Sequence, residues 1–409
     1  MKRIIVINSF QGKKDFIFEN LSYFGYSIIL ADNIVPKTIE QYIYDFLKVD
    51  TFQVNSAYNT IINYCKDNQI EGILTFWEDD VLLTAKLNQT LNLSGIPFYI
   101  AQNIRNKYNF RKISKKLGIP SPYFLKLTEE ILGNLPENII FPGVIKPAFG
   151  ASSAYITLCK NKEDLIYFYK KISKEINENI ESALHDGLEL FYESFIEGKE
   201  IDIDMLIQNG ECKYIVITDN NDTGGPYFQE IGQNAPSFLD ENLQKLIKEQ
   251  AINYIQKLGI YDACLHFEAK VFNNILIPIE INLRMGGDEV WYFNKYVYGV
   301  DLVEMSTKIA CGEKIGDYKN IEPKCQLYGE YILPHKKGII TKININYEKL
   351  KELGVIKINL NKKEGDFIEI PPNEFSFIGW FILKMNTINT KEKDKFINNI
   401  KNFISITID

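Results

Sequence analysis

The sequence lacks the features that would place it outside the ordinary globular proteins. Its six cysteines are scattered with no close pair, which argues against a zinc site or a disulfide framework and favours a reducing cytoplasm. No apolar run approaches membrane-spanning length, and the first one, Ile4–Ile7, is too short for a signal peptide. Basic residues are not in excess, because the net charge is −7. We therefore expect a cytoplasmic protein that binds neither nucleic acid nor membrane.

Two glycine-rich signatures of nucleotide binding are also missing. The sequence NSFQG over Asn8–Gly12, which follows the first apolar run, is not a GxGxxG motif, so a dinucleotide-binding fold is not supported. The turn at 150–153 has one glycine and is not a Walker loop. Any nucleotide site must be of another kind.

The length and the pattern of the chain predict an α/β (α+β) protein of two or three domains. Of its 409 residues, 45% are hydrophobic and 24% charged, as in globular proteins. In the first hundred residues, short apolar strands alternate with amphipathic helices, which predicts a parallel sheet with helical crossovers. The expected strands there are 4–8, 27–30 and 72–76, and the expected helices are 58–67 and 81–91.

The later chain is expected to be mixed and then β-rich. A helix carrying Lys107 and Arg111 is expected to end at Leu117. The sequence GIPSP at 118–122 follows and marks a domain boundary. The segment 219–236, rich in Asn, Asp, Gly and Pro, is expected to be a mobile or ligand-covering loop. The other expected elements are strand 144–146, helix 162–176, a strand pair 188–193 and 200–207, helix 241–258, strands 326–333, 338–345, 367–370 and 379–385, and helix 391–403.

Two neighbouring segments carry polar groups at every second residue. Glu280, Asn282 and Arg284 alternate with apolar residues, and the segment before them has His266, Glu268 and Lys270 at the same spacing. Side chains two apart on a strand share a face. Carboxylates and an amide oxygen suit a hard divalent cation, and an arginine beside them suits a phosphate. The alternative is a hairpin whose polar face simply meets solvent.

The turn between these two segments tests the metal interpretation. In a hairpin with a two-residue loop and no irregularity, Glu268 would lie opposite Ile279, and Glu280 would face away from it. A shared metal site therefore requires a three-residue loop or a β-bulge, for instance at Pro278. We predict such an offset.

A second polar region surrounds Lys146. This lysine ends an apolar strand and precedes a turn of small residues with two hydroxyls, Ser152 and Ser153, which could approach phosphate oxygens. Further on, Glu193 ends a strand and Glu200 begins the next, with an apolar pair between them that could line an adenine slot. Taken singly, each of these could also be an ordinary surface residue.

Together, the succession of Lys107, Lys146 with its turn, YESFIEG, HFE and EINLR resembles the ATP-grasp superfamily over about residues 1–390. The sequence looks most like the carboxylate–amine ligase branch that includes the L-amino acid ligases. The resemblance implies that ATP and Mg²⁺ (or Mn²⁺) are bound. The nucleotide would contact Lys107, Lys146, Ser152, Ser153, Glu193, Phe195, Ile196 and Glu200. The metal ions would contact Glu268, Glu280 and Asn282.

The resemblance also implies four parts of the chain. Residues 1–118 would form an N-terminal pre-ATP-grasp α/β domain, and 119–207 a lid or small subdomain with the nucleotide hinge. Residues 208–320 would form the ATP-grasp core with the metal and substrate site, and 321–409 a C-terminal β-rich subdomain. The turn after Lys146 has fewer glycines than the family pattern, which leaves its phosphate contacts open.

The segment after Arg284 is the expected substrate region. Arg284 would hold the reacting phosphoryl or carboxylate group, and the amides of Gly286 and Gly287 could cradle an anion. Asp288 could bind the ammonium of an amino acid, or cap a helix. His266 could bind substrate, act as a base or be a buried core histidine. Glu78 lies after a parallel strand, where ligands bind, or at a charged helix start.

The reaction that follows from this reading joins a carboxylate to an amine. The carboxylate attacks the γ-phosphate of ATP, and the amine then attacks the acyl phosphate, with Arg284, His266 and Gly287 in catalytic roles. Small-molecule carboxylate and amine substrates, amino acids among them, are the expected partners, and the oligomeric state is left open, a homodimer included. The rival readings are another ATP-grasp ligase (a carboxylase or a purine-type enzyme) and a non-catalytic nucleotide-binding regulatory protein.

Overall fold

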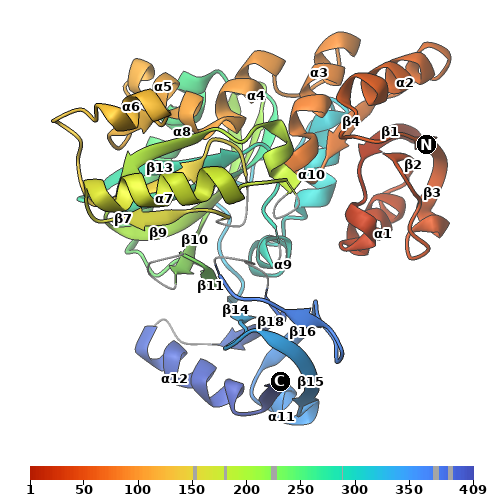
Figure 1. The fold of residues 1–409 in the computed structure, drawn as a ribbon. Coiled ribbons are helices and arrows are strands. Elements are labelled where there is room, and N and C mark those ends of the chain that lie inside the picture. The colour runs from red at the N-terminus through yellow and green to blue at the C-terminus, as the bar shows by residue number, and fades with distance from the viewer. Residues whose placement is uncertain (151–153, 179–181, 223–227, 288, 372–376, 386–389) are drawn as a thin grey trace.

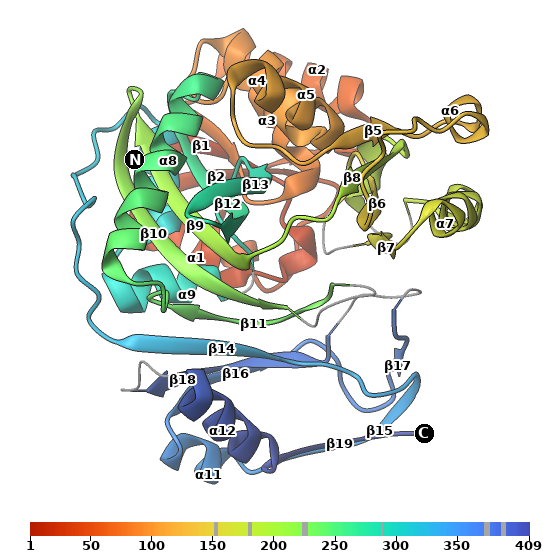
Figure 2. The same ribbon diagram turned by 90° about the vertical axis from the view of Figure 1, so that its left-hand side faces the viewer.

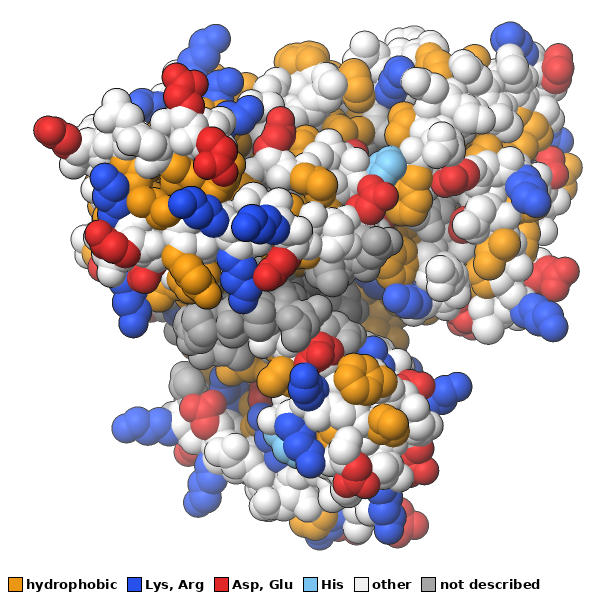
Figure 3. Space-filling model, viewed as in Figure 1, with side chains coloured by type: hydrophobic (Ala, Val, Ile, Leu, Met, Phe, Trp, Pro, Cys, Tyr) orange, Lys and Arg blue, Asp and Glu red, His pale blue; other side chains and the backbone are white. Residues whose placement is uncertain are grey.

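The chain folds into an N-terminal lobe, a central body and a C-terminal lobe, which lie one after another in the computed structural model (Figure 1). On the face drawn in Figure 3, acidic and basic side chains are interspersed, without a patch of one sign. The structure describes residues 1–150, 154–178, 182–222, 228–287, 289–371, 377–385 and 390–409.

The N-terminal lobe is built on a four-stranded parallel sheet in the order β3-β2-β1-β4. Alternate residues of β1 pack on opposite sides, with Ile4 and Val6 in one core and Ile5 and Ile7 in another. Parallel strands that are covered on both faces read as continuous apolar runs, as this one does. The strands are β1 (Lys2–Ile7), β2 (Tyr26–Asp32), β3 (Ile43–Lys48) and β4 (Gly72–Thr75). The helices that cover them are α1 (Asp15–Tyr23), α2 (Val54–Asp67), α3 (Val81–Leu91) and α10 (Leu302–Ala310).

Two helices connect this lobe to the central body. They are α4 (Phe98–Arg105) and α5 (Lys107–Leu117). The side chain of Asn106 accepts a hydrogen bond from the amide of Asn109 and so caps the start of α5. At the other end, Gly118 adopts a left-handed conformation with φ 65°, which is typical of a helix C-terminus.

The central body contains a small antiparallel sheet and a large one. The small sheet has the order β5-β8-β6-β7 and packs against α7 (Figure 2). Its elements are β5 (Phe124–Lys126), α6 (Glu129–Gly133), β6 (Gly143–Pro147), β7 (Thr157–Cys159), α7 (Lys162–Glu175) and β8 (Leu190–Ser194). The large sheet has eight strands in the order β13-β12-β9-β10-β11-β14-β18-β16 and continues into the C-terminal lobe. Its strands are β9 (Lys199–Gln208), β10 (Glu211–Asp222), β11 (Glu230–Ala235), β12 (Ala263–Phe272), β13 (Ile275–Asn282), β14 (Gln326–Ile332), β16 (Val355–Leu360) and β18 (Gly379–Met385).

One face of the large sheet forms the main core. The odd-numbered residues of β9 and β12, such as Ile203 and Phe267, pack against α8 (Glu241–Leu258), α4 and α5. Because successive side chains alternate between faces, the even-numbered residues of the same strands point to the opposite side. That opposite face carries the polar residues.

The C-terminal lobe completes the chain. It packs Tyr328 and Phe381 of the large sheet against two helices. A three-stranded sheet in the order β17-β15-β19 closes the lobe. Its elements are β15 (Gly338–Ile345), α11 (Tyr347–Glu352), β17 (Phe367–Ile368), α12 (Thr390–Lys401) and β19 (Ile404–Ile408). The remaining short elements are α9 (Val290–Phe293), 3₁₀ turns at Phe10–Gly12, Glu40–Tyr42, Glu78–Asp80 and Ser182–Asp186, and a π-helical turn at Asn294–Tyr298.

The predicted fold class is confirmed, although some details are wrong. Strands β3, β5, β7, β10, β16 and β19 were not predicted. The expected strand pair 188–193 and 200–207 exists as β8 and β9, but these strands belong to different sheets. The expected loop 219–236 is mostly strand: β10 extends to Asp222 and β11 covers Glu230–Ala235, while 223–227 lies outside the described residues. Its polar residues form strands because ladder pairing and side-chain contacts with neighbouring strands outweigh their low strand propensity.

The predicted division into four parts remains a prediction. The sheets group the chain differently. Strand β9, most of which lies in the predicted small subdomain, belongs to the large sheet, and so do β14, β16 and β18 of the predicted C-terminal subdomain. Among the described helices, none is both long and apolar enough to span a bilayer.

A buried acid in the N-terminal lobe gives a first prediction. Asp80 is 2% exposed and accepts a hydrogen bond from Asn8 Nδ2 at 2.8 Å. Burial, with the nearby charges of Asp79 and Asp32, raises the pKa of Asp80 to about 7. The folded protein therefore keeps a proton that an unfolded chain, with an aspartate pKa near 4, releases. The stability that this proton contributes is lost as the pH rises from about 4 to about 7.

We expect Asp80→Asn to become more stable relative to the wild type by about 2–3 kcal/mol between pH 5 and pH 8. Chemical denaturation at several pH values measures this change. Asp67→Asn, at an exposed position, should show no such trend. A constant difference between Asp80→Asn and wild type would contradict the raised pKa.

Candidate active site

A large cavity lies between the small sheet and the polar face of the large sheet. It encloses roughly 1160 Å³, including the part that is open to solvent. Of the described residues that line it, six are carboxylates and three are lysines. The carboxylates are Glu193, Glu200, Asp202, Glu230, Glu268 and Glu280, and the lysines are Lys107, Lys146 and Lys270. The cavity therefore carries an excess of negative charge.

The polar face of β9, β12 and β13 is organised in three cross-strand rows. Residues directly opposite each other in an antiparallel sheet have their Cβ atoms about 5 Å apart and share a face. The first row pairs Glu200 with Lys270, the second joins Asp202, Glu268 and Glu280, and the third joins Asp204, His266 and Asn282. The middle row thus contains three carboxylates side by side.

A β-bulge brings Glu280 into this middle row. The turn between β12 and β13 has two residues, Asn273 and Asn274, both with positive φ. Glu268 nevertheless pairs with Glu280 and not with Ile279, because the register shifts between Glu268 and the next residue. The predicted offset is confirmed as a bulge at Ile279. Nη2 of the fully buried Arg111 donates to the carbonyl oxygen of Ile279 at 2.8 Å and holds the bulge.

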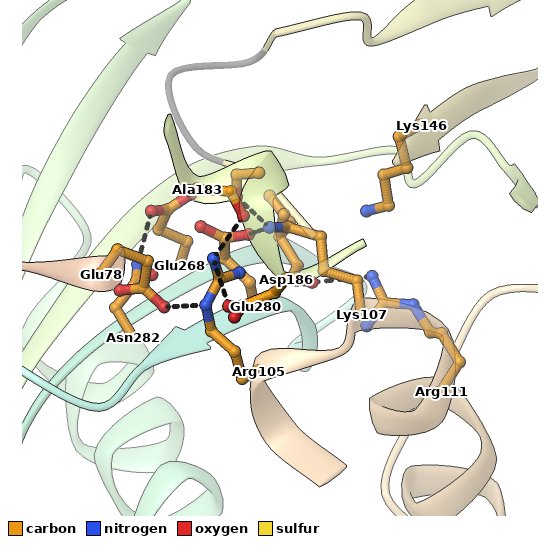
Figure 4. Close-up of polar contacts among 12 residues, drawn as sticks. Glu78, Arg105, Lys107, Arg111, Lys146, Ala183, Asp186, Glu268, Glu280 and Asn282 are labelled. Atoms are coloured by element: carbon orange, nitrogen blue, oxygen red, sulfur yellow. Dashed lines mark hydrogen bonds and ion pairs between the residues drawn. The ribbon is translucent and has the colours of Figure 1, made fainter. Parts of the chain in front are cut away.

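Lys107 links Glu280 to the turn after Lys146. Its Nζ lies 2.6 Å from Glu280 Oε2 and donates to the carbonyl oxygen of Gly150 at 2.7 Å (Figure 4). The N-cap of α5 fixes the start of the helix from which this side chain extends. Burial would raise the pKa of Glu280, but the ion pair with Lys107 lowers it to about 2. Glu280 is therefore ionised at neutral pH.

Lys146 is held by a buried ion-pair group. Its Nζ lies 2.6 Å from one oxygen of Glu193, and Arg111 Nε donates to the other at 2.7 Å. All three side chains are at most 4% exposed. Burial lowers the pKa of Lys146, while the two cations hold the pKa of Glu193 below its usual range although burial opposes this. The Glu193 carboxylate therefore positions Lys146 at the cavity; a contact of Glu193 with adenine remains a prediction.

Glu268, like Asp202, is an acid of the middle row without an ion pair to a described lysine or arginine, whereas Glu280 pairs with Lys107. Asn282 Nδ2 donates to Glu268 Oε1 at 3.0 Å. Burial, and then the charges of Glu280, Glu200 and Glu230, raise the pKa of Glu268 well above its usual range. Two unit charges about 5 Å apart repel by about 3 kcal/mol at an effective dielectric of 20. A bound cation would relieve this repulsion.

The donor set fits magnesium or manganese. Glu268, Glu280 and the amide of Asn282 offer the oxygen ligands that these ions take, and Mg²⁺ is commonly held by one or two carboxylates together with substrate phosphates. Within the described ranges, no group of three or more His, Cys, Asp or Glu residues is arranged to hold a metal ion. The residues therefore fit an ion that is shared with a bound phosphate, rather than one enclosed by protein ligands alone.

Arg284 is held by Glu78 from the N-terminal lobe. Its Nε lies 3.0 Å from Glu78 Oε2, and its Nη1 donates to the carbonyl oxygen of Met285 at 2.8 Å. The other oxygen of Glu78 lies 3.3 Å from Nε of the buried Arg105 (Figure 4). Arg105 also contacts Asp186 at 3.3 Å. Glu78 thus lies between two guanidinium groups, where it orients Arg284; direct substrate binding by Glu78 remains a prediction.

His266 belongs to a buried hydrogen-bond chain. Its Nδ1 lies 2.8 Å from Asp204 Oδ1, and Asn294 Nδ2 donates to Asp204 Oδ2 at 2.7 Å. Tyr214 donates in turn to Asn294 Oδ1 at 2.6 Å. His266 also lines the cavity, so its ring is fixed by the carboxylate on one side and faces the site on the other.

Of the two glycines after Arg284, Gly286 is closely packed and Gly287 is not. A Cβ on Gly286 would lie 2.8 Å from His266 Nδ1 and 2.6 Å from a methyl carbon of Val290, so no larger residue fits without a shift. A Cβ on Gly287 would lie 3.8 Å from Lys14 Nζ. Asp288, Ser152 and Ser153, three of the predicted site residues, lie outside the described residues.

The remaining predicted nucleotide residues line the hinge between β8 and β9. Phe195, Ile196 and Glu200 all border the cavity. The Phe195 amide donates to the carbonyl oxygen of Pro142 at 2.9 Å, and Lys270 Nζ lies 4.8 Å from the centre of the Phe195 ring. Lys270 also lies 3.4 Å from Glu200, so this end of the cavity combines an apolar slot with an ion pair.

Several residues of the site escaped the sequence reasoning, among them two acids and two arginines. Asp202 and Asp204 follow Glu200 at every second position, so the alternation that revealed β12 and β13 was present in β9 as well. Arg105 and Arg111 gave no such signal, because their partners lie in distant segments of the chain.

Comparison with known proteins identifies the class. Residues 139–291 match the ATP-grasp domain family. The crystal structure of an L-amino acid ligase from Bacillus licheniformis has a TM-score of 0.84 and 22% identity to this chain, and the match covers 100% of this chain and 99% of that one. This chain therefore contains an ATP-grasp domain and has the overall fold of an ATP-grasp protein, which confirms the resemblance inferred from its sequence.

The chain is also similar to curated ligases and synthases. Carnosine synthase 1 of Mus musculus is 25% identical over 333 residues, which are 76% of this chain and 40% of that protein. Alanine–anticapsin ligase of Bacillus subtilis is 26% identical over 264 residues, which are 61% of this chain and 55% of that protein. The matches thus span less than two thirds of the length of either relative.

The buried ion-pair group gives a second prediction. Arg111→Gln removes one cation from Glu193 and the donor that holds the bulge, so we expect the free energy of unfolding to fall by about 3 kcal/mol. Lys116→Gln removes a charge from the exposed side of the same helix and should change it by less than about 0.5 kcal/mol. Urea denaturation measures both. Equal effects of the two substitutions would show that Arg111 does not hold the site together.

Proposed function

We propose that this protein is an ATP-dependent carboxylate–amine ligase that forms an amide bond through an acyl phosphate and releases ADP and phosphate. The observation that carries the proposal is the middle row of carboxylates, with Lys107 and Lys146 in the same cavity. A row of acids is suited to metal-bound phosphates, and the lysines are suited to the phosphates themselves. The ATP-grasp fold and the similarity to ligases support the same conclusion.

The nucleotide would lie between the two sheets of the central body. The adenine would occupy the apolar slot at Phe195 and Ile196, with its edge near Glu193 and its ribose near Glu200. Lys146 and Lys107 would contact the phosphates. The ion pair with Glu280 holds Lys107 beside the turn that follows Lys146. The turn residues Ser152 and Ser153 would complete the phosphate contacts. Glu268, Glu280 and Asn282 would hold the magnesium or manganese ions.

The first step brings two anions together. A substrate carboxylate and the γ-phosphate at about 4 Å repel each other by about 4 kcal/mol at an effective dielectric near 20. Bound magnesium would supply charge neutralisation for the phosphates. Arg284 would hold the reacting carboxylate, and the Glu78 carboxylate fixes the direction of its guanidinium group. Lys146 and Lys107 would stabilise the charge that develops on the transferred phosphoryl group.

The second step needs a free amine and a stabilised oxyanion. His266, which Asp204 orients, would accept a proton from the incoming ammonium. The amides of Gly286 and Gly287 would donate to the tetrahedral oxyanion, an interaction worth about 3–4 kcal/mol in known enzymes. The absence of a side chain on Gly286 lets the backbone pass close to the His266 ring at Nδ1.

Amino acids are the proposed substrates. The relatives include an L-amino acid ligase and an alanine–anticapsin ligase, whose names specify amino acid substrates. Asp288 would bind an ammonium group at the substrate end of the site. A homodimer and a cytoplasmic location remain predictions from the sequence.

Glu280→Gln tests the metal role. This change removes the negative charge that pairs with Lys107 and that would bind the metal ions. We therefore expect the rate of ADP release to fall at least a hundredfold. The fold should persist, because the amide is nearly the same size as the carboxylate. The measurement is ADP release with ATP, magnesium and an amino acid mixture, together with a melting curve.

Glu249→Gln, at an exposed position of α8, is the matched control and should leave turnover unchanged. Turnover of Glu280→Gln close to that of the wild type would refute the metal role of the middle row. Loss of the melting transition in Glu280→Gln would instead make the residue structural.

A substrate screen separates the ligase from its rivals. We expect ADP release to rise at least tenfold with particular pairs of the twenty amino acids, and mass spectrometry to detect the dipeptide. Stimulation by bicarbonate or by a purine ribonucleotide alone would indicate another ATP-grasp chemistry. Nucleotide binding by calorimetry without ADP release under any of these conditions would indicate a regulatory protein.

A further inference from the structure

Arg105 is a buried residue that the proposed reaction steps do not use. It is the last residue of α4, and its side chain is 1% exposed. It is not among the described residues that line the large cavity. A buried guanidinium group is costly unless its charge and its N–H groups are compensated, so the partners of Arg105 indicate what it does.

Two distant parts of the chain meet at Arg105. From the N-terminal lobe, Glu78 Oε1 lies 3.3 Å from its Nε. The other partners belong to the segment Ser182–Asp186, which precedes β8 of the small sheet. The carbonyl oxygen of Ala183 accepts a hydrogen bond from Nη2 at 2.9 Å, and Asp186 Oδ2 lies 3.3 Å from the same nitrogen (Figure 4).

The segment Ser182–Asp186 is docked against the N-terminal lobe at other points as well. Nε2 of His185 lies 3.0 Å from the carbonyl oxygen of Phe52, and the centres of the two rings are 4.8 Å apart. The Ser182 hydroxyl donates a hydrogen bond to the Asp79 carboxylate. Through β8 the segment is continuous with the small sheet, which forms one side of the cavity.

Glu78 is shared between two arginines, since Oε1 faces Arg105 and Oε2 lies 3.0 Å from Nε of Arg284. A guanidinium group with no other partner pairs with both oxygens of a carboxylate through two parallel donors. Here Nη2 of Arg105 is occupied by Ala183 and Asp186. Only its Nε faces Glu78, which leaves the second oxygen for Arg284. Undocking of the segment would free Nη2 and draw that oxygen away from Arg284.

The network is held by charge more than by aligned hydrogen bonds. Three of its buried atoms, Arg105 Nε, Glu78 Oε2 and Asp186 Oδ2, form no hydrogen bond among the described residues and lie only at ion-pair distance. Such pairs depend on separation and do not fix one orientation. A displacement of Asp186 therefore changes how strongly Arg105 is drawn to Glu78.

We propose that Arg105 is a positioning residue of the ligase reaction. It aligns Arg284 through Glu78 as long as the segment Ser182–Asp186 is docked. This inference rests on the proposed function, in which Arg284 holds the reacting carboxylate. Because the small sheet also carries Lys146, the carboxylate is held in place only when the phosphate-binding side of the cavity is in position.

Arg105→Lys tests this role while keeping the charge. One ammonium group cannot replace Nε at Glu78 and Nη2 at Ala183 together. For an amino acid pair that stimulates the wild type, we expect the kcat of ADP release to fall at least tenfold. The KM for ATP should stay within twofold, because the nucleotide contacts are unchanged. Arg3→Lys, the matched change on β1, should alter neither value.

A double variant shows whether Arg105 acts through Glu78. If both residues belong to one chain of contacts, Arg105→Lys with Glu78→Gln should turn over within twofold of Glu78→Gln alone, because the link is already broken. Two reductions that multiply would overturn the proposal. A lowered melting temperature of Arg105→Lys, with kcat and the KM for ATP impaired alike, would make the residue structural.

Hydrogen exchange of the ligand-free protein tests the coupling without turnover. Arg284→Lys leaves Glu78 free to turn towards Arg105 and so weakens the bond to Ala183. We therefore expect this variant, like Arg105→Lys, to raise the exchange rate of the amides of 182–187 at least threefold, measured by mass spectrometry. Arg3→Lys should not raise it.

Unchanged exchange in Arg284→Lys would overturn the coupling even if the ligase is active. Failure of the ligase itself would appear differently, as absence of ADP release from the wild type with every amino acid pair, whatever the exchange rates. The two failures are therefore distinguishable.

Discussion

The site is governed by the concentration of negative charge on one face of a β-sheet. Asp202, Glu268 and Glu280 lie side by side on three adjacent strands, with Asp202 buried and the other two partly buried. Such an arrangement opposes folding unless cations compensate it. Lys107 forms an ion pair with Glu280 at one end of the row. Under the proposed function, magnesium bound with the phosphates would compensate the rest of the row.

The backbone irregularity at Ile279 makes this concentration of charge possible. Without the bulge, Glu280 would pack with the apolar residues against the main core. Arg111 connects the bulge to the nucleotide side of the cavity, because the same guanidinium group that binds the Ile279 carbonyl also pairs with Glu193, which in turn holds Lys146. One buried helix residue thus connects the middle row of carboxylates to Lys146.

The N-terminal lobe supplies a second connection. Glu78, at the end of a parallel strand, joins Arg284 of the large sheet to Arg105 of α4, and Arg105 contacts Asp186 in the segment before β8. Four parts of the chain therefore meet at one network of charges. Through this network the N-terminal lobe orients Arg284, although that lobe contributes no strand to the large sheet.

The sequence alone determined the alternation of polar residues in β12 and β13, the family resemblance and the bounds of regular elements such as α3, α8 and β15, because these depend on local periodicity and capping. It even required an offset in the hairpin, since a two-residue turn and a shared face are incompatible without one. Only the tertiary structure decided that β8 and β9 belong to different sheets, that polar segments 219–222 and 230–235 form strands, and that Glu78 faces two arginines. These features depend on partners that are far away in the chain, and no local pattern of residues specifies which distant group will meet a given side chain.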